Sequence, residues 1–261
     1  MKYSHRSIII IFFFLLSFAP FIDGHEIQKE FTFSNSDHGW VGEFADYPVG
    51  GENFFELGWG WENLPIAIEF PGENLTKGLF LSGNNHSDDL FMFIKHQMDG
   101  LRPNTFYDLT YSILIECNTP SGISIGIGGS PGKNVYFKAG ASNTEPKKIA
   151  VNDYYLLNID KGNQSHSGKS ALVIGDLESP APDPYDLVYF PKQLSHEIPL
   201  RVQSDPQGRL WLFLGTDSGF EGTTKFYIAK VSLHLNEVEP FVNFMSANEK
   251  SLHGCPSSRY K

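Results

Sequence analysis

The chain has 261 residues, of which 41% are hydrophobic and 14% aromatic, and its 30 acidic and 20 basic residues give a formal net charge of −10. A disordered chain would be poor in large apolar side chains, so this composition indicates a folded protein of one domain or two small ones. The acidic balance argues against a nucleic-acid partner, because phosphate groups are bound by positively charged surfaces.

The first 24 residues have the pattern of a secretory signal peptide. Lys2 and Arg6 precede an apolar run at 8–18, and a short polar segment ending at Gly24 follows. The run has about 11 residues, whereas a membrane-spanning helix needs about 20. We therefore expect cleavage near Gly24, a secreted or periplasmic mature protein, and no membrane span after signal removal.

The rest of the chain is predicted to form strands joined by turns. Leu90–Ile94 is apolar throughout, which predicts a central strand covered on both faces. Phe106–Cys117 and Lys225–Leu235 alternate apolar and polar residues, as half-buried strands do, and Leu210–Leu214 is a short apolar run. Further segments predicted as strands are Phe31–Phe33, Phe54–Leu57, Ile66–Phe70, Leu79–Ser82, Ile123–Ile127, Val135–Lys138, Tyr154–Ile159, Ala171–Ile174, Leu187–Phe190 and Ile198–Gln203.

Many short strands with Gly/Pro turns and without helical periodicity indicate an all-β sandwich or barrel. We expect a single domain at 25–239 and a loosely ordered C-terminal tail at 240–261. Cys117 lies on the apolar face of its strand, where a free thiol packs as a small hydrophobic group. A disulfide to Cys255 in the tail is the alternative in an oxidising compartment.

Three parts of the sequence follow one another in the order and spacing of a known fold. They are Phe31–Trp40, Gly100–Tyr107, and the pair Leu210–Leu214 with Lys225–Leu235. These parts resemble the opening strand, the central turn and strand, and the closing strands of the galactose-binding-like jelly roll found in many carbohydrate-binding modules. The resemblance covers residues 31–235. It implies a jelly-roll-like antiparallel β-sandwich that binds a carbohydrate or other surface glycan.

A second resemblance lies in Gly83–Phe93, Gly126–Gly132 and Gly215–Glu221. These segments are similar to segments of exported bacterial proteins of unknown function. That resemblance implies export and no particular activity.

Two polar loops, at 84–89 and 216–221, are the candidate sites, because loops at the rim of a sandwich commonly hold its functional residues. One interpretation is turn architecture, since Asn, Asp and Ser side chains bond to nearby backbone. A second is a calcium site, to which Asp46 could also contribute, with the ligands Asp88, Asp89, Asp217 and Glu221. A third is the acid–base site of a hydrolase, formed by His86, Asp88, Asp217 and Glu221.

Trp59 and Trp61 are the candidate stacking residues for a sugar ring. Their spacing of two places both indoles on one face of an extended strand. The alternative is burial, which is the more common position of aromatic side chains in an all-β domain. Asn85 and His86 complete the candidate ligand-binding set.

The sequence thus predicts an exported, non-catalytic binding protein for a glycan, with calcium as its candidate cofactor. An exported hydrolase and a structural or interaction protein of the cell envelope are the alternatives. Exposure of Trp59 and Trp61 would favour the binding protein. Convergence of the two polar loops in a cleft would favour an enzyme or a metal site. The oligomeric state is not predicted by any of these features.

Overall fold

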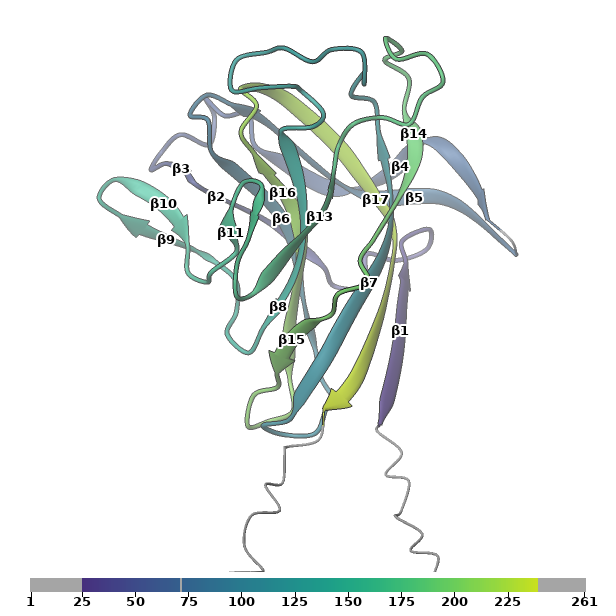
Figure 1. Ribbon diagram of the computed structural model, residues 1–261, viewed down its shortest axis with the longest axis vertical. Helices are drawn as coiled ribbons and strands as arrows, with labels where there is room; N and C mark the ends of the chain where they lie inside the picture. Colours follow the sequence, from purple (N-terminus) through teal and green to yellow (C-terminus); the bar gives the residue numbers. More distant parts are fainter. Residues whose placement is uncertain (1–24, 71, 239–261) are drawn as a thin grey trace, which may run out of the picture.

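The computed structural model describes residues 25–70 and 72–238, so the predicted signal peptide, the C-terminal tail and Cys255 lie outside it. The regular elements within the described ranges are strands, and no helix there is long and apolar enough to cross a bilayer. The first and last strands, β1 (Glu26–Thr32) and β17 (Gly222–Val238), pair antiparallel along the whole of β1 (Figure 1). Both ends of the described chain therefore join the same sheet.

The larger sheet has seven strands. Its path runs β14–β7–β17–β5–β4, with β1 beside β17 and β15 beside β7. The bounds of the members not yet given are β4 (Gly58–Phe70), β5 (Glu73–Asn85), β7 (Phe106–Cys117), β14 (Phe190–Ser195) and β15 (Leu200–Gln203). The strand predicted from alternation at Phe106–Cys117 is confirmed with the same bounds, and the one at Lys225–Leu235 lies within β17.

The smaller sheet has five strands in the order β13–β8–β16–β6–β2. Their bounds are β2 (Val41–Ala45), β6 (Leu90–Met98), β8 (Val135–Ser142), β13 (Ala171–Asp176) and β16 (Leu210–Ser218). The central strand predicted at Leu90–Ile94 is confirmed, because β6 lies between two other strands and both of its faces are buried there.

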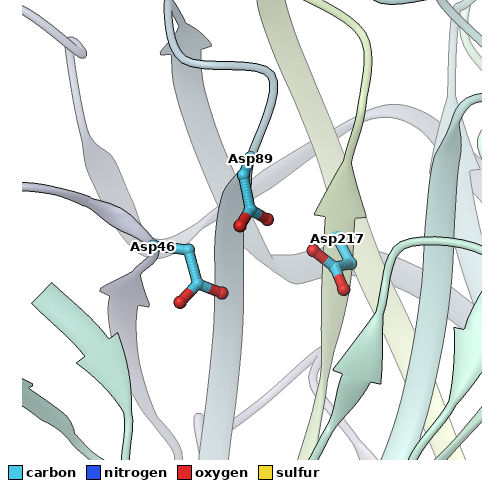
Figure 2. A group of neighbouring side chains, drawn as sticks. All are labelled: Asp46, Asp89 and Asp217. Atoms are coloured by element: carbon cyan, nitrogen blue, oxygen red, sulfur yellow. The ribbon is translucent and has the colours of Figure 1, made fainter.

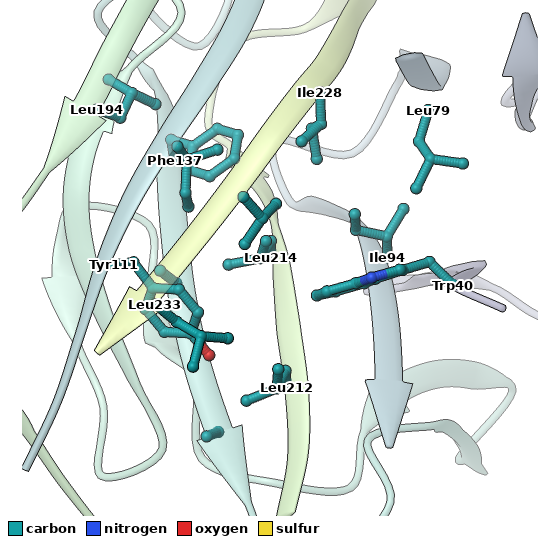
Figure 3. Close-up of a cluster of buried hydrophobic side chains, with 14 of the residues drawn as sticks. Trp40, Leu79, Ile94, Tyr111, Phe137, Leu194, Leu212, Leu214, Ile228 and Leu233 are labelled. Atoms are coloured by element: carbon teal, nitrogen blue, oxygen red, sulfur yellow. The ribbon is translucent and has the colours of Figure 1, made fainter. Parts of the chain in front are cut away.

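The two sheets pack face to face and enclose the main core, as an all-β antiparallel sandwich does. Alternate residues point inward, so the larger sheet contributes Leu79, Ile228 and Leu233, and the smaller sheet contributes Ile94 and Leu212 (Figure 3). Side chains from both sheets interdigitate in this layer, and most are withdrawn from solvent. Burial of this apolar surface is the main force that holds the sheets together.

A second layer covers the outer face of the five-stranded sheet. Phe91, Phe93 and Phe213 point outward and are buried against Leu157 and Ile159. The covering residues belong to 143–170, which we call the covering segment. Its strands are β9 (Lys148–Val151), β10 (Tyr154–Leu157), β11 (Gly162–Asn163) and β12 (His166–Ser167). β10 also pairs with the short strand β3 (Tyr47–Pro48), which lies outside the segment.

Three predicted strands are wrong. Of Leu187–Phe190 only Phe190 lies in a strand, and Leu187 is 67% exposed. Phe54–Leu57 forms turns, in which the Phe55 N–H donates to Gly51 O at 2.9 Å. Ile123–Ile127 is a loop with Ile125 87% exposed, and no strand of the described chain pairs with it. Apolar residues form a strand only where their backbone pairs along a neighbouring strand. Phe55 O accepts the Asn84 N–H of β5 at 2.6 Å, but the rest of its segment is taken up by turns.

Candidate functional site

The two polar loops predicted from the sequence meet at one end of the sandwich. The Asn85 side-chain amide donates to Ser218 O and Phe220 O, both at 2.9 Å, and its oxygen accepts the Ser87 N–H at 3.1 Å. Asn85 is only 2% exposed, so its polar atoms serve the junction between the loops. This corrects the prediction of Asn85 as a ligand contact: it is a structural residue.

The structure does not bring the predicted hydrolase residues together. His86 is exposed and its ring stacks on Phe54, with centroids 4.1 Å apart. Asp88 is exposed and Glu221 is half-buried, whereas Asp217 is completely buried. Asp217 therefore cannot reach a substrate that His86 and Asp88 would contact at the surface.

A cluster of three carboxylates is buried beneath the covering segment. Asp217 lies on β16, Asp46 follows β2, and Asp89 directly precedes β6 (Figure 2). One oxygen from each of the three lies within 4.8 Å of the others. Of the four residues predicted as metal ligands, the cluster contains Asp89 and Asp217 but not Asp88 or Glu221.

Two lysines enter the same cluster. The Lys161 ammonium lies 2.7 Å from Asp217 Oδ2 and 3.0 Å from Asp46 Oδ2. Lys138 Nζ lies 2.9 Å from Asp217 Oδ2 and donates to the backbone oxygens of Lys161 and His166, also at 2.9 Å. The sequence alone does not identify either lysine as a site residue, because the covering segment that buries them reaches the cluster only through long-range contacts.

Burial changes how readily these groups ionise. Burial raises the pKa of Asp89 to about 7, and the carboxylates of Asp46 and Asp217 add to the rise. Burial also raises the pKa of Asp46 and lowers the pKa of Lys138. Burial alone would lower the pKa of Lys161, but the Asp217 and Asp46 carboxylates outweigh it, and the net direction is upward. Lys161 is thus held as an ammonium.

The cluster does not fit a calcium ion. Calcium takes about 6–8 oxygen ligands, and here three carboxylates are shared with two amino groups. Asp217 Oδ2 also accepts the Gln164 N–H at 2.8 Å. The Lys161 ammonium already supplies the positive charge between Asp46 and Asp217, so a divalent cation would have to expel it.

Trp59 and Trp61 stand on β4 and are 41% and 37% exposed. The Trp61 indole N–H donates to Phe33 O at 2.6 Å, and Lys77 Nζ lies 4.3 Å from the centroid of its ring. Trp59 lies against Gly42, where an added Cβ would come within 2.3 Å of the indole. Each indole is therefore held at a fixed place while more than a third of its surface faces solvent.

A groove crosses the outer face of the seven-stranded sheet over β1, β17 and β7. Its volume is about 450 Å³. Hydroxyl, amide and imidazole groups predominate among the polar groups that line it, and they can both donate and accept hydrogen bonds. They come from Gln28, Thr110, Ser112, Ser195, His196, Ser232 and His234.

No family model matches the chain, and no curated protein has a significant sequence match to it. The solved structures that are similar to it include carbohydrate-binding modules and an adhesin domain. The adhesin domain of Lys-gingipain from Porphyromonas gingivalis W83 is 11% identical, with a TM-score of 0.36 over 79% of this chain and 97% of that one.

Two carbohydrate-binding modules are similar to this chain to about the same degree. One, from the β-sandwich superfamily, is 11% identical with a TM-score of 0.37 over 80% of this chain and 61% of that one. The mannan-recognising module TmCBM27 is 11% identical with a TM-score of 0.33 over 80% of this chain and 98% of that one. At these TM-scores the likeness carries no information on a ligand or a site.

Proposed function

We propose that this protein is an exported, non-catalytic glycan-binding protein and that Trp59 and Trp61 form its stacking surface. The observation that carries the proposal is the pair of fixed, partly exposed indoles on one strand. The C–H faces of a pyranose ring are apolar and pack well against a flat aromatic ring, while the hydroxyl groups at the edge stay hydrated or bond to polar side chains.

The local geometry suits such a ligand. Residues two apart on a strand are separated by about 6.6 Å along its axis, so the two indoles can contact one extended sugar chain. Lys77 can donate hydrogen bonds to hydroxyl groups beside Trp61. Trp61 is held by its hydrogen bond to Phe33 O, and Trp59 is held by its contact with Gly42. The stacking surface is therefore formed before a ligand arrives.

Titration calorimetry with a glycan that binds the wild type tests this surface. We expect Trp59→Ala and Trp61→Ala each to weaken binding by about tenfold or more, because a buried aromatic contact contributes about 1.5 kcal/mol or more. Phe106→Ala is the matched control, since Phe106 is an aromatic residue of similar exposure that lies on β7, outside the pair. Trp variants that bind as tightly as the wild type would overturn the assignment.

The groove on the seven-stranded sheet is the second candidate surface, because its polar lining also suits a hydroxyl-rich ligand. Ser112→Ala and Ser232→Ala remove hydroxyl groups from its floor and tell the two surfaces apart. If the glycan binds through Trp59 and Trp61, both serine variants keep wild-type affinity. Loss of affinity in the serine variants alone would move the site to the groove.

A further inference from the structure

An amino group and a carboxyl group are in contact in the interior, closed off from water. The side chains of Lys138 and Asp217 have no exposed surface, and Nζ lies 2.9 Å from Oδ2. Lys138 lies opposite Gly215 in the pairing of β8 with β16, so Asp217 is its diagonal neighbour on the same face. A long side chain can span this diagonal.

The surroundings of Lys138 suit an uncharged amine. Its nitrogen donates to the backbone oxygens of Lys161 and His166. A neutral amine has two N–H bonds and one lone pair, so these two acceptors account for its hydrogens and leave the lone pair for attack on Cγ once Lys138 has lost its ammonium proton. Burial favours this neutral form, which is why the pKa of Lys138 is lowered.

The surroundings of Asp217 favour nucleophilic attack by an amine on its carboxyl carbon. Oδ2 receives the Lys161 ammonium and the Gln164 N–H, while Oδ1 is buried without a hydrogen-bond donor. Asp89 lies beside it, with one carboxylate oxygen of each residue within 4.8 Å of the other, and the Asp217 carboxylate contributes to the raised pKa of Asp89. At neutral pH a large fraction of Asp89 therefore carries a proton next to Asp217.

We propose that Lys138 and Asp217 join in an intramolecular amide bond between Nζ and Cγ. One C–O bond of the Asp217 carboxyl group breaks and the oxygen leaves as water. The net change is an ammonium and a carboxylate converted to an amide and one water molecule. The step requires no oxidant, reductant or co-reactant.

The neighbouring groups supply what this condensation requires. The Lys161 ammonium and the Gln164 N–H stabilise the negative oxygen that develops when nitrogen attacks Cγ. Asp89 relays two protons in turn from the Lys138 nitrogen to the departing oxygen, so that the oxygen leaves as water and Asp89 ends with the proton it began with. Fixed contact between the reacting groups replaces a bimolecular encounter, and an ionised pair in the interior lacks the hydration that favours it in water.

Mass spectrometry of the full chain tests the proposal. With the N-terminus established by peptide mapping, we expect a mass about 18 Da below that of the sequence, the mass of one water. Trypsin cannot cleave after an acylated Lys138, so the digest should contain 134–147 joined to 210–225. A chain with its full sequence mass overturns the proposal. So does the loss of one water elsewhere, such as a succinimide at Asp99 before Gly100.

Three variants separate the chemistry from folding. Lys138→Met removes the nucleophile and should restore the full mass. Asp89→Asn keeps both reacting groups and nearly the same shape, so full mass in this variant, with folding verified by circular dichroism, assigns the proton transfer to Asp89. Lys95→Met is the control, because Lys95 is a buried, ion-paired lysine outside the cluster, and it should keep the branched peptide. A branch at Lys161 in the wild type would overturn the choice of Lys138.

Discussion

Glu116 shows how a single residue on a predicted polar face acquires a different role. The alternation of Phe106–Cys117 predicts Glu116 on the solvent side of its strand. The structure buries it, because β4 bends over this face and Leu64 and Ile68 pack against Leu114 there. One of its carboxylate oxygens has no hydrogen-bond partner. Local periodicity assigns a side chain to a face, and it cannot tell whether a distant segment covers that face.

The burial of Glu116 makes stability depend on pH. Burial raises the pKa of Glu116 from 4.5 to about 7, although the Ile66 N–H acts in the opposite direction. Between these values the folded protein holds a proton that the unfolded chain has released. The stability that this proton provides is complete below about pH 4.5 and is lost as the pH rises through about 7.

Glu116→Gln should remove that dependence. We expect the wild type to lose about 2–3 kcal/mol more of its unfolding free energy than the variant between pH 5 and pH 8. Urea unfolding at both pH values measures the difference. Glu69→Gln, an exposed carboxylate on the same strand β4, should behave like the wild type. Equal losses in the wild type and Glu116→Gln would show that Glu116 does not titrate in this range.

At the scale of elements, the loops at the end of the sandwich form one packed unit. Gly128 has φ of 70° and Gly129 has φ of 121°, which glycine adopts without strain. A Cβ on Gly128 would lie 1.9 Å from Gly219 O, so the turn lies directly against the loop after β16. Asn85 links that same loop to the end of β5. The polar residues that the sequence suggested as a site serve here mainly as turn and junction residues.

Asn85→Ala tests this role of the junction. The substitution removes the amide donor that Ser218 O and Phe220 O share, although Phe220 O keeps the Ser218 hydroxyl, so we expect a loss of about 1–3 kcal/mol in unfolding free energy. Asn84→Ala is the neighbouring control, because Asn84 makes one side-chain bond, to the exposed Glu56. A loss in Asn85→Ala no larger than in Asn84→Ala, measured by urea unfolding, would contradict the assignment.

At the scale of the whole molecule, strand chemistry predicted the all-β sandwich well, since alternation and turn residues are local signals. The covering segment and the cluster beneath it were not predictable in the same way. The cluster takes Asp46, Asp89, Asp217 and Lys138 from one side of the five-stranded sheet and closes them with Lys161 from the covering segment. No spacing in the sequence encodes that meeting, because it depends on how a whole segment folds back over the sheet.

The most direct test of the glycan-binding account is the thermal stability of the mature protein across a panel of glycans, in calcium and in EDTA. A ligand that binds only the folded state raises the melting temperature by mass action. We expect at least one class of glycan to raise it in the wild type, to the same extent with calcium and with EDTA, and to have no effect on the Trp59→Ala/Trp61→Ala double variant. A panel without any shift, or a shift that the double variant retains in full, would contradict the account.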